Sequence, residues 1–296
     1  MQSYHSLSAQ VYQLDKPIGC SFGDVEYYQQ RLKDVKGKIL EPAVGTGRIL
    51  IPLLQSGFNI EGFDLSEEML EFCKKNLIEH GFTTNYVTQN NLVTFEVNTP
   101  VEAIIIPTGT FLLLNTQQQA IQALKQCYQA LEFGGRLLVD ISLAHHFVKG
   151  ECTSRQFNTP EGDLITLQII NAEIDYINQL TTSHHRYDKW RDGKIIESEW
   201  EVFSLKWFGV SEFEQILRLI GFKQITISAD YQYLQTPSNT TEIMTFEAYK
   251  NKVLNNKRLY LKLIFYSLIY FAFLKLINIG SCIFMCGIYK RCKASF

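Results

Sequence analysis

The fold of this 296-residue chain is decided by the stretch Ile39-Leu40-Glu41-Pro42-Ala43-Val44-Gly45-Thr46-Gly47-Arg48. An acidic residue, Glu41, closes a short apolar run, and two glycines then lead into a helical pattern. Glycines at such a turn let a ligand lie against bare backbone, where N–H groups are available for its polar end. The stretch therefore predicts a strand, a tight turn and a helix that form one wall of a ligand site.

A second acidic position, Asp64, follows the next apolar run, seventeen residues beyond Gly47. A carboxylate at the end of a second strand can accept both hydroxyls of a ribose. Two cofactor classes use this geometry. A dinucleotide site needs a third glycine, but that position is Leu50, so a nicotinamide coenzyme loses its main support. S-adenosylmethionine has no pyrophosphate and does not need that glycine.

The sequence around this stretch alternates short apolar runs with helical patterns, which is typical of a parallel sheet with crossover helices. Ser66 is expected to cap one helix, with Glu67 and Glu68 in its first turn and Gly81 just past its end. The pattern predicts an α/β doubly wound sheet. Strands are expected at 38–41, 59–63, 84–88, 101–106 and 136–141, and helices at 47–55, 66–80 and 117–131, the last stopping at Gly134-Gly135.

The rhythm changes between about 150 and 206, where long β-branched and aromatic segments replace the alternation. Asp192-Gly193 is a hairpin signal between two of them. These segments, 164–174, 175–187 and 194–207, predict an antiparallel insertion. The doubly wound pattern then resumes with a capping box at Ser211 and Glu214, a helix ending at Gly221, and strands at 224–228 and 242–248.

Five stretches carry a family resemblance: 41–47, 64–66 with Met69-Leu70, 89–92, 105–111 and 131–137. Because they occur in that family's order, the sequence resembles the class I S-adenosylmethionine-dependent methyltransferases over roughly residues 10–249. The resemblance implies a Rossmann-like seven-stranded sheet with an antiparallel β insertion after strand five. It divides the chain into an N-terminal cap (1–37), a methyltransferase domain (38–249, with the insertion at about 150–206) and a tail (250–296). By this resemblance the residues that bind S-adenosyl-L-methionine are Glu41, Ala43, Gly45, Gly47, Asp64, Leu65, Met69, Asn90, Asn91, Leu92, Ile106, Pro107 and Thr108.

Two positions depart from the family pattern. Ala43 replaces the first glycine and adds a methyl group near the methionine portion of the cofactor. Asn91 stands where an aspartate is common; its carbonyl can still accept a proton of the adenine amino group, but the charge is gone. Three alternatives to an active methyltransferase therefore stay open: a relative that has lost cofactor binding, a non-catalytic cofactor-binding module at a membrane, and the disfavoured nicotinamide oxidoreductase.

The segment after the fourth strand, Ile106-Pro107-Thr108-Gly109, bears on the methyl acceptor. It lacks the polar and aromatic residues of enzymes that methylate base amines, and the Pro-Cys of cytosine-C5 enzymes. Residues 1–249 carry a formal charge of about −11, which argues against a nucleic-acid groove. We therefore expect a small-molecule acceptor and no nucleic-acid partner.

In relatives with such an insertion, the insertion and the N-terminal segment cover the acceptor. The candidates here include aromatic residues that, on a strand face, belong to a core more often than to a pocket. Transfer needs in-line attack of the acceptor on the sulfonium methyl, and a general base only if the acceptor arrives protonated. His184 and His185 are adjacent in a strand, so they face opposite ways and cannot form one site. The candidate acceptor residues are Asp24, Tyr27, Tyr28, Tyr187, Trp190 and Trp207; His145 and His146 are the candidate bases, with simple loop histidines as the alternative.

The seven cysteines contain no C-x-x-C pair, so neither a disulfide framework nor a metal site is expected, and the N-terminal segment has no apolar run typical of a secretory signal. These features predict a cytoplasmic catalytic domain. The tail differs from the rest: from Lys250 onward it carries nine basic residues and no acidic one. Residues 263–289 contain a single charge, Lys275, and are long enough for a membrane-spanning helix. An interfacial anchor and an extension without function are the alternatives.

Overall fold

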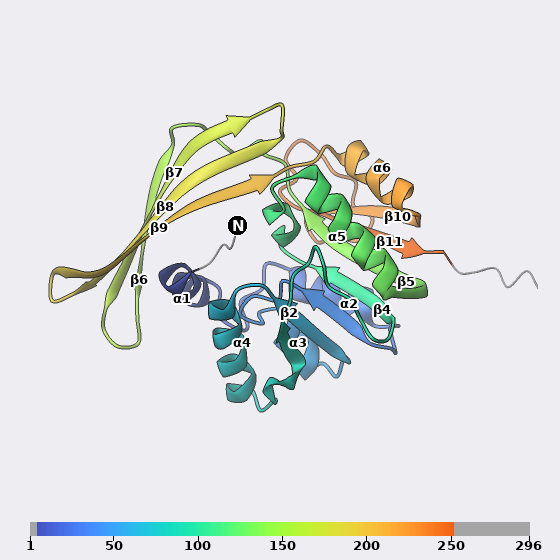
Figure 1. Cartoon of the computed structure of the whole chain (residues 1–296), viewed down its shortest axis with the longest axis horizontal. Helices are drawn as coiled ribbons and strands as arrows, with labels where there is room; N and C mark the ends of the chain where they lie inside the picture. The colour runs from blue at the N-terminus through green and yellow to red at the C-terminus, as the bar shows by residue number, and fades with distance from the viewer. Residues whose placement is uncertain (1–4, 252–296) are drawn as a thin grey trace, which may run out of the picture. The chain divides into compact units, whose positions relative to one another are not determined.

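The computed structural model describes residues 5–251, and a seven-stranded sheet forms their centre (Figure 1). The strand order is β10-β11-β5-β4-β1-β2-β3. Strands β3, β2, β1, β4 and β5 run parallel, whereas β11 is antiparallel to both β5 and β10. The strands are β1 (Ile39–Pro42), β2 (Ile60–Asp64), β3 (Val87–Gln89), β4 (Val101–Ile106), β5 (Leu131–Ile141), β10 (Phe222–Ala229) and β11 (Met244–Lys250).

Alternate residues of the central strands pack into two separate cores, one on each face of the sheet. Ile104 and Ile106 of β4 belong to the core beneath helices α5 and α6, whereas Ala103 and Ile105 belong to the core beneath α2, α3 and α4. Burial on both faces explains why β4 is an uninterrupted apolar run. The helices are α2 (Asp24–Leu32), α3 (Leu50–Gln55), α4 (Glu67–Glu79), α5 (Gln117–Ala130) and α6 (Val210–Ile220).

A four-stranded antiparallel sheet follows β5, as the sequence predicts, and lies to one side of the central sheet in Figure 1. Asp192 and Gly193 both have positive φ, 50° and 73°, and form the tight hairpin turn expected of them. The insertion contains one strand more than predicted, because the polar, exposed first strand has no apolar pattern to reveal it. Its strands are β6 (Cys152–Asn158), β7 (Leu164–Asp175), β8 (Leu180–Arg191) and β9 (Lys194–Lys206).

Helix α1 (Ser6–Asp15) packs against this insertion. Leu7 and Val11 join Ile165, Leu167 and Tyr187 in a small apolar cluster. The carboxylate of Glu199 on β9 accepts hydrogen bonds from the backbone N–H groups of Leu7 and Ser8, at 2.9 and 3.1 Å. An anionic acceptor at a helix N-terminus satisfies N–H groups that have no partner within the helix.

Several predicted element boundaries are wrong. The strand predicted at 84–88 is a 3₁₀ turn followed by β3 from Val87, and the segment predicted at 175–187 is β8, which begins at Leu180. Helix α5 ends at Ala130, and Gly134-Gly135 lies inside β5 instead of ending a helix. Helix α6 is capped two residues earlier than predicted. The N–H of Gly209 donates to the carboxylate of Glu212 at 3.0 Å, and Ser211 with Glu214 plays no such part. The helix after the glycine turn begins at Leu50, because Gly47 has φ 85° and cannot start it.

A short 3₁₀ helix, η1 (Thr84–Tyr86), precedes β3, and a second, η2 (Thr110–Leu113), follows β4. No helix within residues 5–251 is long and apolar enough to cross a membrane. The predicted membrane-spanning helix at 263–289 falls outside the described residues.

Candidate functional site

A cavity of about 300 Å³ opens at the carboxyl ends of β1, β2, β3 and β4. Ligands of open α/β sheets bind at this edge. The cavity brings together most of the residues predicted to bind the cofactor, although their loops are widely separated in sequence. Gly47 and Ile106 do not line it; the residues that do are Glu41, Ala43, Gly45, Asp64, Leu65, Met69, Asn90, Asn91, Leu92, Pro107 and Thr108.

The turn after β1 is left-handed at three positions, with φ of 55° at Ala43, 57° at Gly45 and 85° at Gly47. Ala43 pays about 1–2 kcal/mol for this conformation, which explains why glycine is the usual residue there. A side chain on Gly47 would lie 2.9 Å from Sγ of Cys73, whereas one on Gly45 would meet nothing within 4 Å. Gly47 therefore serves packing against α4, and Gly45 leaves the cavity wall open.

The carboxylate of Asp64 is held at the cavity by two backbone hydrogen bonds. One oxygen accepts from the N–H of Gly45 at 2.8 Å, and the other accepts from the N–H of Ser66 at 2.9 Å. Ser66 also caps α4 as predicted, its hydroxyl accepting from the N–H of Met69. Each oxygen of Asp64 keeps further lone-pair capacity, which suits it to accept the two hydroxyls of a ribose.

Glu41 is a buried carboxyl group in the cavity wall. Its side chain is buried, and its Oε2 makes no hydrogen bond within the described residues. Burial raises the pKa of Glu41 well above its usual value, with Arg48 acting in the opposite direction. A buried carboxylate oxygen without a partner is costly, so it fits a ligand that brings a cation. The α-ammonium group of an amino acid is such a cation.

The loop after β3 supplies the next part of the wall. The N–H of Asn90 donates to the carbonyl oxygen of Asp64 at 2.9 Å, which fastens this loop to the preceding one. Oδ1 of Asn91 accepts from the N–H of Val93 at 2.8 Å and retains a second lone pair. The cavity wall thus contains the carboxyl groups of Glu41 and Asp64 and the amide of Asn91, together with the apolar side chains of Leu65 and Leu92.

Comparison with known proteins agrees with this arrangement. A family model described as a methyltransferase domain matches residues 39–135. The uncharacterized methyltransferase OB1106 of Oceanobacillus iheyensis is 32% identical over 170 residues, which cover 56% of this chain and 75% of that protein. The chain is a class I S-adenosylmethionine-dependent methyltransferase.

Solved structures show the same fold. A S-adenosylmethionine-dependent methyltransferase from Clostridium acetobutylicum aligns with a TM-score of 0.67 at 16% identity, covering 82% of this chain and 97% of its own. The sugar N-methyltransferase KedS8 from Streptoalloteichus aligns with a TM-score of 0.67 at 16% identity, covering 85% and 96%. The nicotinamide alternative is not supported: Leu50, where a third glycine would stand, is a fully buried core residue of α3.

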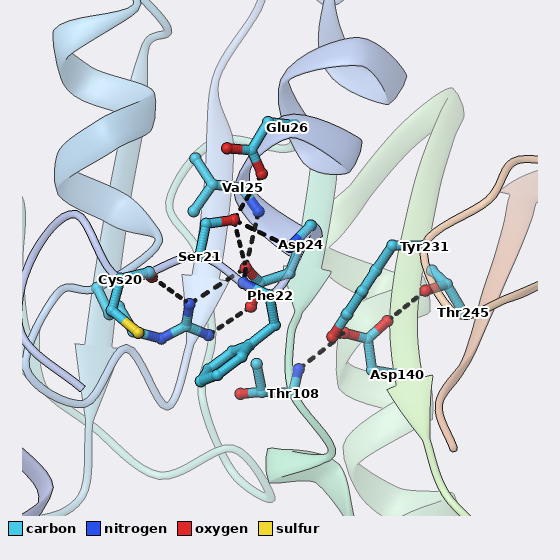
Figure 2. Close-up of polar contacts among 12 residues, drawn as sticks. Cys20, Ser21, Phe22, Asp24, Val25, Glu26, Thr108, Asp140, Tyr231 and Thr245 are labelled. Atoms are coloured by element: carbon cyan, nitrogen blue, oxygen red, sulfur yellow. Dashed lines mark hydrogen bonds and ion pairs between the residues drawn. The ribbon is translucent and has the colours of Figure 1, made fainter. Parts of the chain in front are cut away.

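A buried ion pair joins the N-terminal cap of the methyltransferase to the glycine turn. Arg48 donates to the carboxylate of Asp24 at 2.5 and 3.2 Å and to the carbonyl oxygen of Cys20 at 3.0 Å. Figure 2 shows Asp24 also receiving the backbone N–H groups of Phe22 and Val25. Although burial acts to raise it, these donors hold the pKa of Asp24 below its usual value. The pair places the guanidinium of Arg48 at the cavity wall.

The rest of the cavity is made by residues that the sequence did not single out. Tyr12 and Lys16 come from α1 and the residue after it, and Phe203 and Leu205 come from β9 of the insertion. The remaining wall is mostly apolar and follows strands four and five: Thr110, Leu112, Leu113, Leu114 and Ser142. The alternation of side chains along β9 places Phe203 and Leu205 on one face of the strand, and this much is visible in the sequence. Which face covers the cavity depends on tertiary packing, which the sequence does not show.

The six predicted acceptor residues lie outside the lining of this cavity. Asp24 is occupied by Arg48, and Tyr27 and Tyr28 are buried in the core beneath α2. Tyr187 packs in the cluster under α1. On the insertion, Trp190 donates to Oγ1 of Thr166 at 3.0 Å, and the ring of Trp207 contacts that of Tyr176.

His145 and His146 are exposed in the loop after β5, with their rings 3.8 Å apart, and neither lines the cavity. Their assignment as bases stays a prediction. His184 and His185 face opposite sides of β8 as expected: His184 contacts the ring of Trp200, whereas His185 stacks on Phe203.

Proposed function

We propose that this methyltransferase transfers the methyl group to a small molecule held between the exit of β4 and the insertion. The observation that carries the proposal is the make-up of the cavity. One half consists of the loops proposed to bind the cofactor. The other half consists of Phe203 and Leu205 of β9 and the leucines at the end of η2 and just after it. Helix α1 contributes Tyr12 and Lys16 to the same cavity. A cavity of about 300 Å³ with such a cover suits a small acceptor rather than a polymer.

Bound S-adenosylmethionine supplies an electrophilic methyl group on a sulfonium that is already a good leaving group. The chain's own contribution is then alignment and exclusion of water. Glu41 binds the ammonium end, Asp64 binds the ribose, and the loop at Pro107–Thr108 fixes the floor beside the methyl group. The apolar wall of Phe203 and Leu205 favours an acceptor with apolar surface next to its nucleophilic atom.

The similar structure KedS8 is, by its name, a sugar N-methyltransferase, and another structural neighbour, CalS10, is described as an amino pentose methyltransferase. Both names support a small acceptor, and an amine is one candidate nucleophile. An acceptor that arrives as a free amine needs no base before attack, so the absence of His145 and His146 from the cavity wall is compatible with transfer. The proposal also includes a cytoplasmic catalytic domain and a membrane tether at residues 263–289.

Incubation with labelled methyl donor and a metabolite extract tests the proposal. We expect label in products that pass an ultrafiltration membrane. Phe203→Ala should raise the extract concentration needed for half-maximal rate by roughly tenfold, because a large apolar contact is removed from the acceptor. Its affinity for S-adenosylhomocysteine should stay within about threefold of wild type.

Val202→Ala is the matched control, since Val202 is adjacent in β9 but exposed on the opposite face of the sheet. Val202→Ala should change neither the extract concentration needed for half-maximal rate nor the affinity for S-adenosylhomocysteine. Label found only in retained macromolecules, or a Phe203→Ala variant that behaves like Val202→Ala, would contradict the proposal. Cofactor binding without any turnover would instead favour the non-catalytic module.

A further inference from the structure

A carboxylate that no part of the proposed cofactor site uses lies directly beneath it. Asp140, near the end of β5, is fully buried. Figure 2 shows its side chain meeting Thr108, Tyr231 and Thr245. One oxygen accepts from the backbone N–H of Thr108 at 2.7 Å and from the hydroxyl of Tyr231 at 3.0 Å, and the other accepts from Oγ1 of Thr245 at 2.6 Å. These contacts join the exit of β4 to β5, to β11 and to the loop after β10.

Thr108 is the member of this group with a strained backbone conformation. It lies in the loop that leaves β4, and that loop lines the cavity from Pro107 to Thr110. Its φ is 56°, a left-handed conformation that β-branched residues rarely adopt, and Gly109 follows with φ 72°. Such a backbone persists only where the surroundings hold it. The hydrogen bond from its N–H to Asp140 is the side-chain contact that does so.

We propose that Asp140 is a positioning residue for methyl transfer: by binding the Thr108 amide it holds the exit loop of β4 at the distance and angle that in-line attack requires. The proposal rests on the proposed function, because that function places the acceptor beside this loop. Asp140 does not line the cavity. It acts through Thr108, and its effect should therefore fall on turnover more than on cofactor affinity.

The charge state of Asp140 gives the proposal a second readout. Burial raises the pKa of Asp140 to about 6, and the hydrogen bonds from Thr245, Thr108 and Tyr231 act against that rise. At neutral pH the group is ionised and can accept all three hydrogen bonds. Two tyrosines, Tyr28 of α2 and Tyr231, face the Asp140 carboxylate. Asp24 and Arg48 interact electrostatically with Tyr231. Glu247 on β11 is paired with Arg31 and Arg136.

The test compares Asp140→Asn with wild type. The amide keeps the shape of the side chain, but it has no charge and only one accepting oxygen. Even when that oxygen faces the Thr108 N–H, the hydrogen bond loses its charge assistance and about half of its strength. We expect the Thr108 amide to exchange with solvent at least about tenfold faster, as followed by nuclear magnetic resonance. We expect kcat to fall roughly 10- to 100-fold while the dissociation constant for S-adenosylhomocysteine stays within about threefold. The loss of wild-type kcat below about pH 6 should be absent from the variant.

Thr245→Val is the matched variant, because it removes a donor to the other oxygen of Asp140 and leaves the Thr108 contact in place. It should keep the Thr108 amide protected and shift the acidic limb of kcat to higher pH. Tyr231→Phe should act in the same direction, and it supplies a test if Asp140→Asn does not fold. The proposal is overturned if Asp140→Asn keeps kcat or the protection of Thr108, or if neither hydroxyl variant moves the acidic limb.

Amide exchange needs no acceptor, so it separates this proposal from the proposed function. If no small molecule accepts the methyl group, the proposed function fails. Unchanged exchange at Thr108 in Asp140→Asn would then still show that Asp140 does not hold the loop.

Discussion

The two halves of the cavity are built on different principles. The cofactor half comes from loops that directly follow β1, β2 and β3, and hydrogen bonds from backbone N–H groups join these loops. Gly45 donates to the carboxylate of Asp64, and Asn90 donates to its carbonyl oxygen. The covering half joins α1 to β9, and its contacts connect residues about 190 positions apart, as between Leu7 and Glu199. The first half is determined by local sequence, whereas the second exists only once the insertion has folded over the helix.

This difference suggests that the halves can be changed separately. A family can keep the turn after β1 and the acidic residue after β2 to retain one cofactor, and vary the insertion to change the acceptor. Within residues 5–251 the buried ion pair of Asp24 with Arg48 joins the N-terminal cap to the cofactor half. Substitutions on either side of that pair, and at the pair itself, should therefore give distinct outcomes.

The largest effect is expected at the ion pair. Asp24→Asn leaves the buried guanidinium of Arg48 without a counter-charge, and breaking such a pair costs about 3–5 kcal/mol of unfolding free energy. Urea unfolding measures the loss. Asp15→Asn is the control, because its partner Arg155 is half exposed and surface pairs contribute about 0–1 kcal/mol. Equal losses in the two variants would show that cap and cofactor half are not coupled through Asp24.

The next effect isolates the cofactor half. Asp64→Ala removes the two proposed acceptors for the ribose and the carboxylate that anchors the Gly45 turn. Hydrogen bonds to a charged group contribute about 1.5–3 kcal/mol each, so binding of S-adenosylhomocysteine should weaken by at least about 100-fold in a calorimetric titration. Glu61→Gln serves as the control, since Glu61 lies earlier on β2 and pairs with Lys38 at the surface. Equal affinities of Asp64→Ala and wild type would exclude the ribose contact.

Much of the cofactor half is predictable from sequence because its signals are local. The glycine turn, the acidic residue after β2 and the Ser66 cap each follow from a few neighbouring residues, and the structure brings them to one cavity. Local signals also mislead where two of them compete. Ser211 and Glu214 have the spacing of a capping box, but Glu212 reaches back to Gly209 and starts α6 earlier.

The covering half is not predictable in this way. Lys16 and Phe203 carry no motif, and they line the cavity only because α1 and β9 pack together. Asp140 has no motif either; its three donors come from the exit of β4, the loop after β10 and β11. The predicted acceptor aromatics are a related case: Tyr27 and Tyr28 have the right location in sequence, but the apolar face of α2 turns them into the core.

The third prediction uses pH to examine the group beneath the cavity. The pKa of Asp140 is raised to about 6, above the ordinary value of 3.8, so the folded state takes up this proton first as pH falls. The ionised carboxylate of Asp140 therefore destabilises the folded state above pH 6. Protonation between about pH 6 and pH 4 removes this destabilisation. Wild type should gain roughly 2 kcal/mol of unfolding free energy relative to Asp140→Asn between pH 7 and pH 4. Parallel pH curves for the two proteins would contradict the raised pKa.

The smallest effect isolates the covering half. Glu199→Gln removes the charge that accepts two N–H groups at the start of α1, which should cost about 1 kcal/mol or less, as for other helix caps. Amide exchange should quicken in the first turn of α1, and the half-saturating acceptor concentration should rise about two- to fivefold. Affinity for S-adenosylhomocysteine should stay unchanged, as it should in the control Glu197→Gln, an exposed position two residues away. A parallel loss of cofactor affinity in Glu199→Gln would show that the cover also builds the cofactor site, and that the two halves of the cavity are not independent.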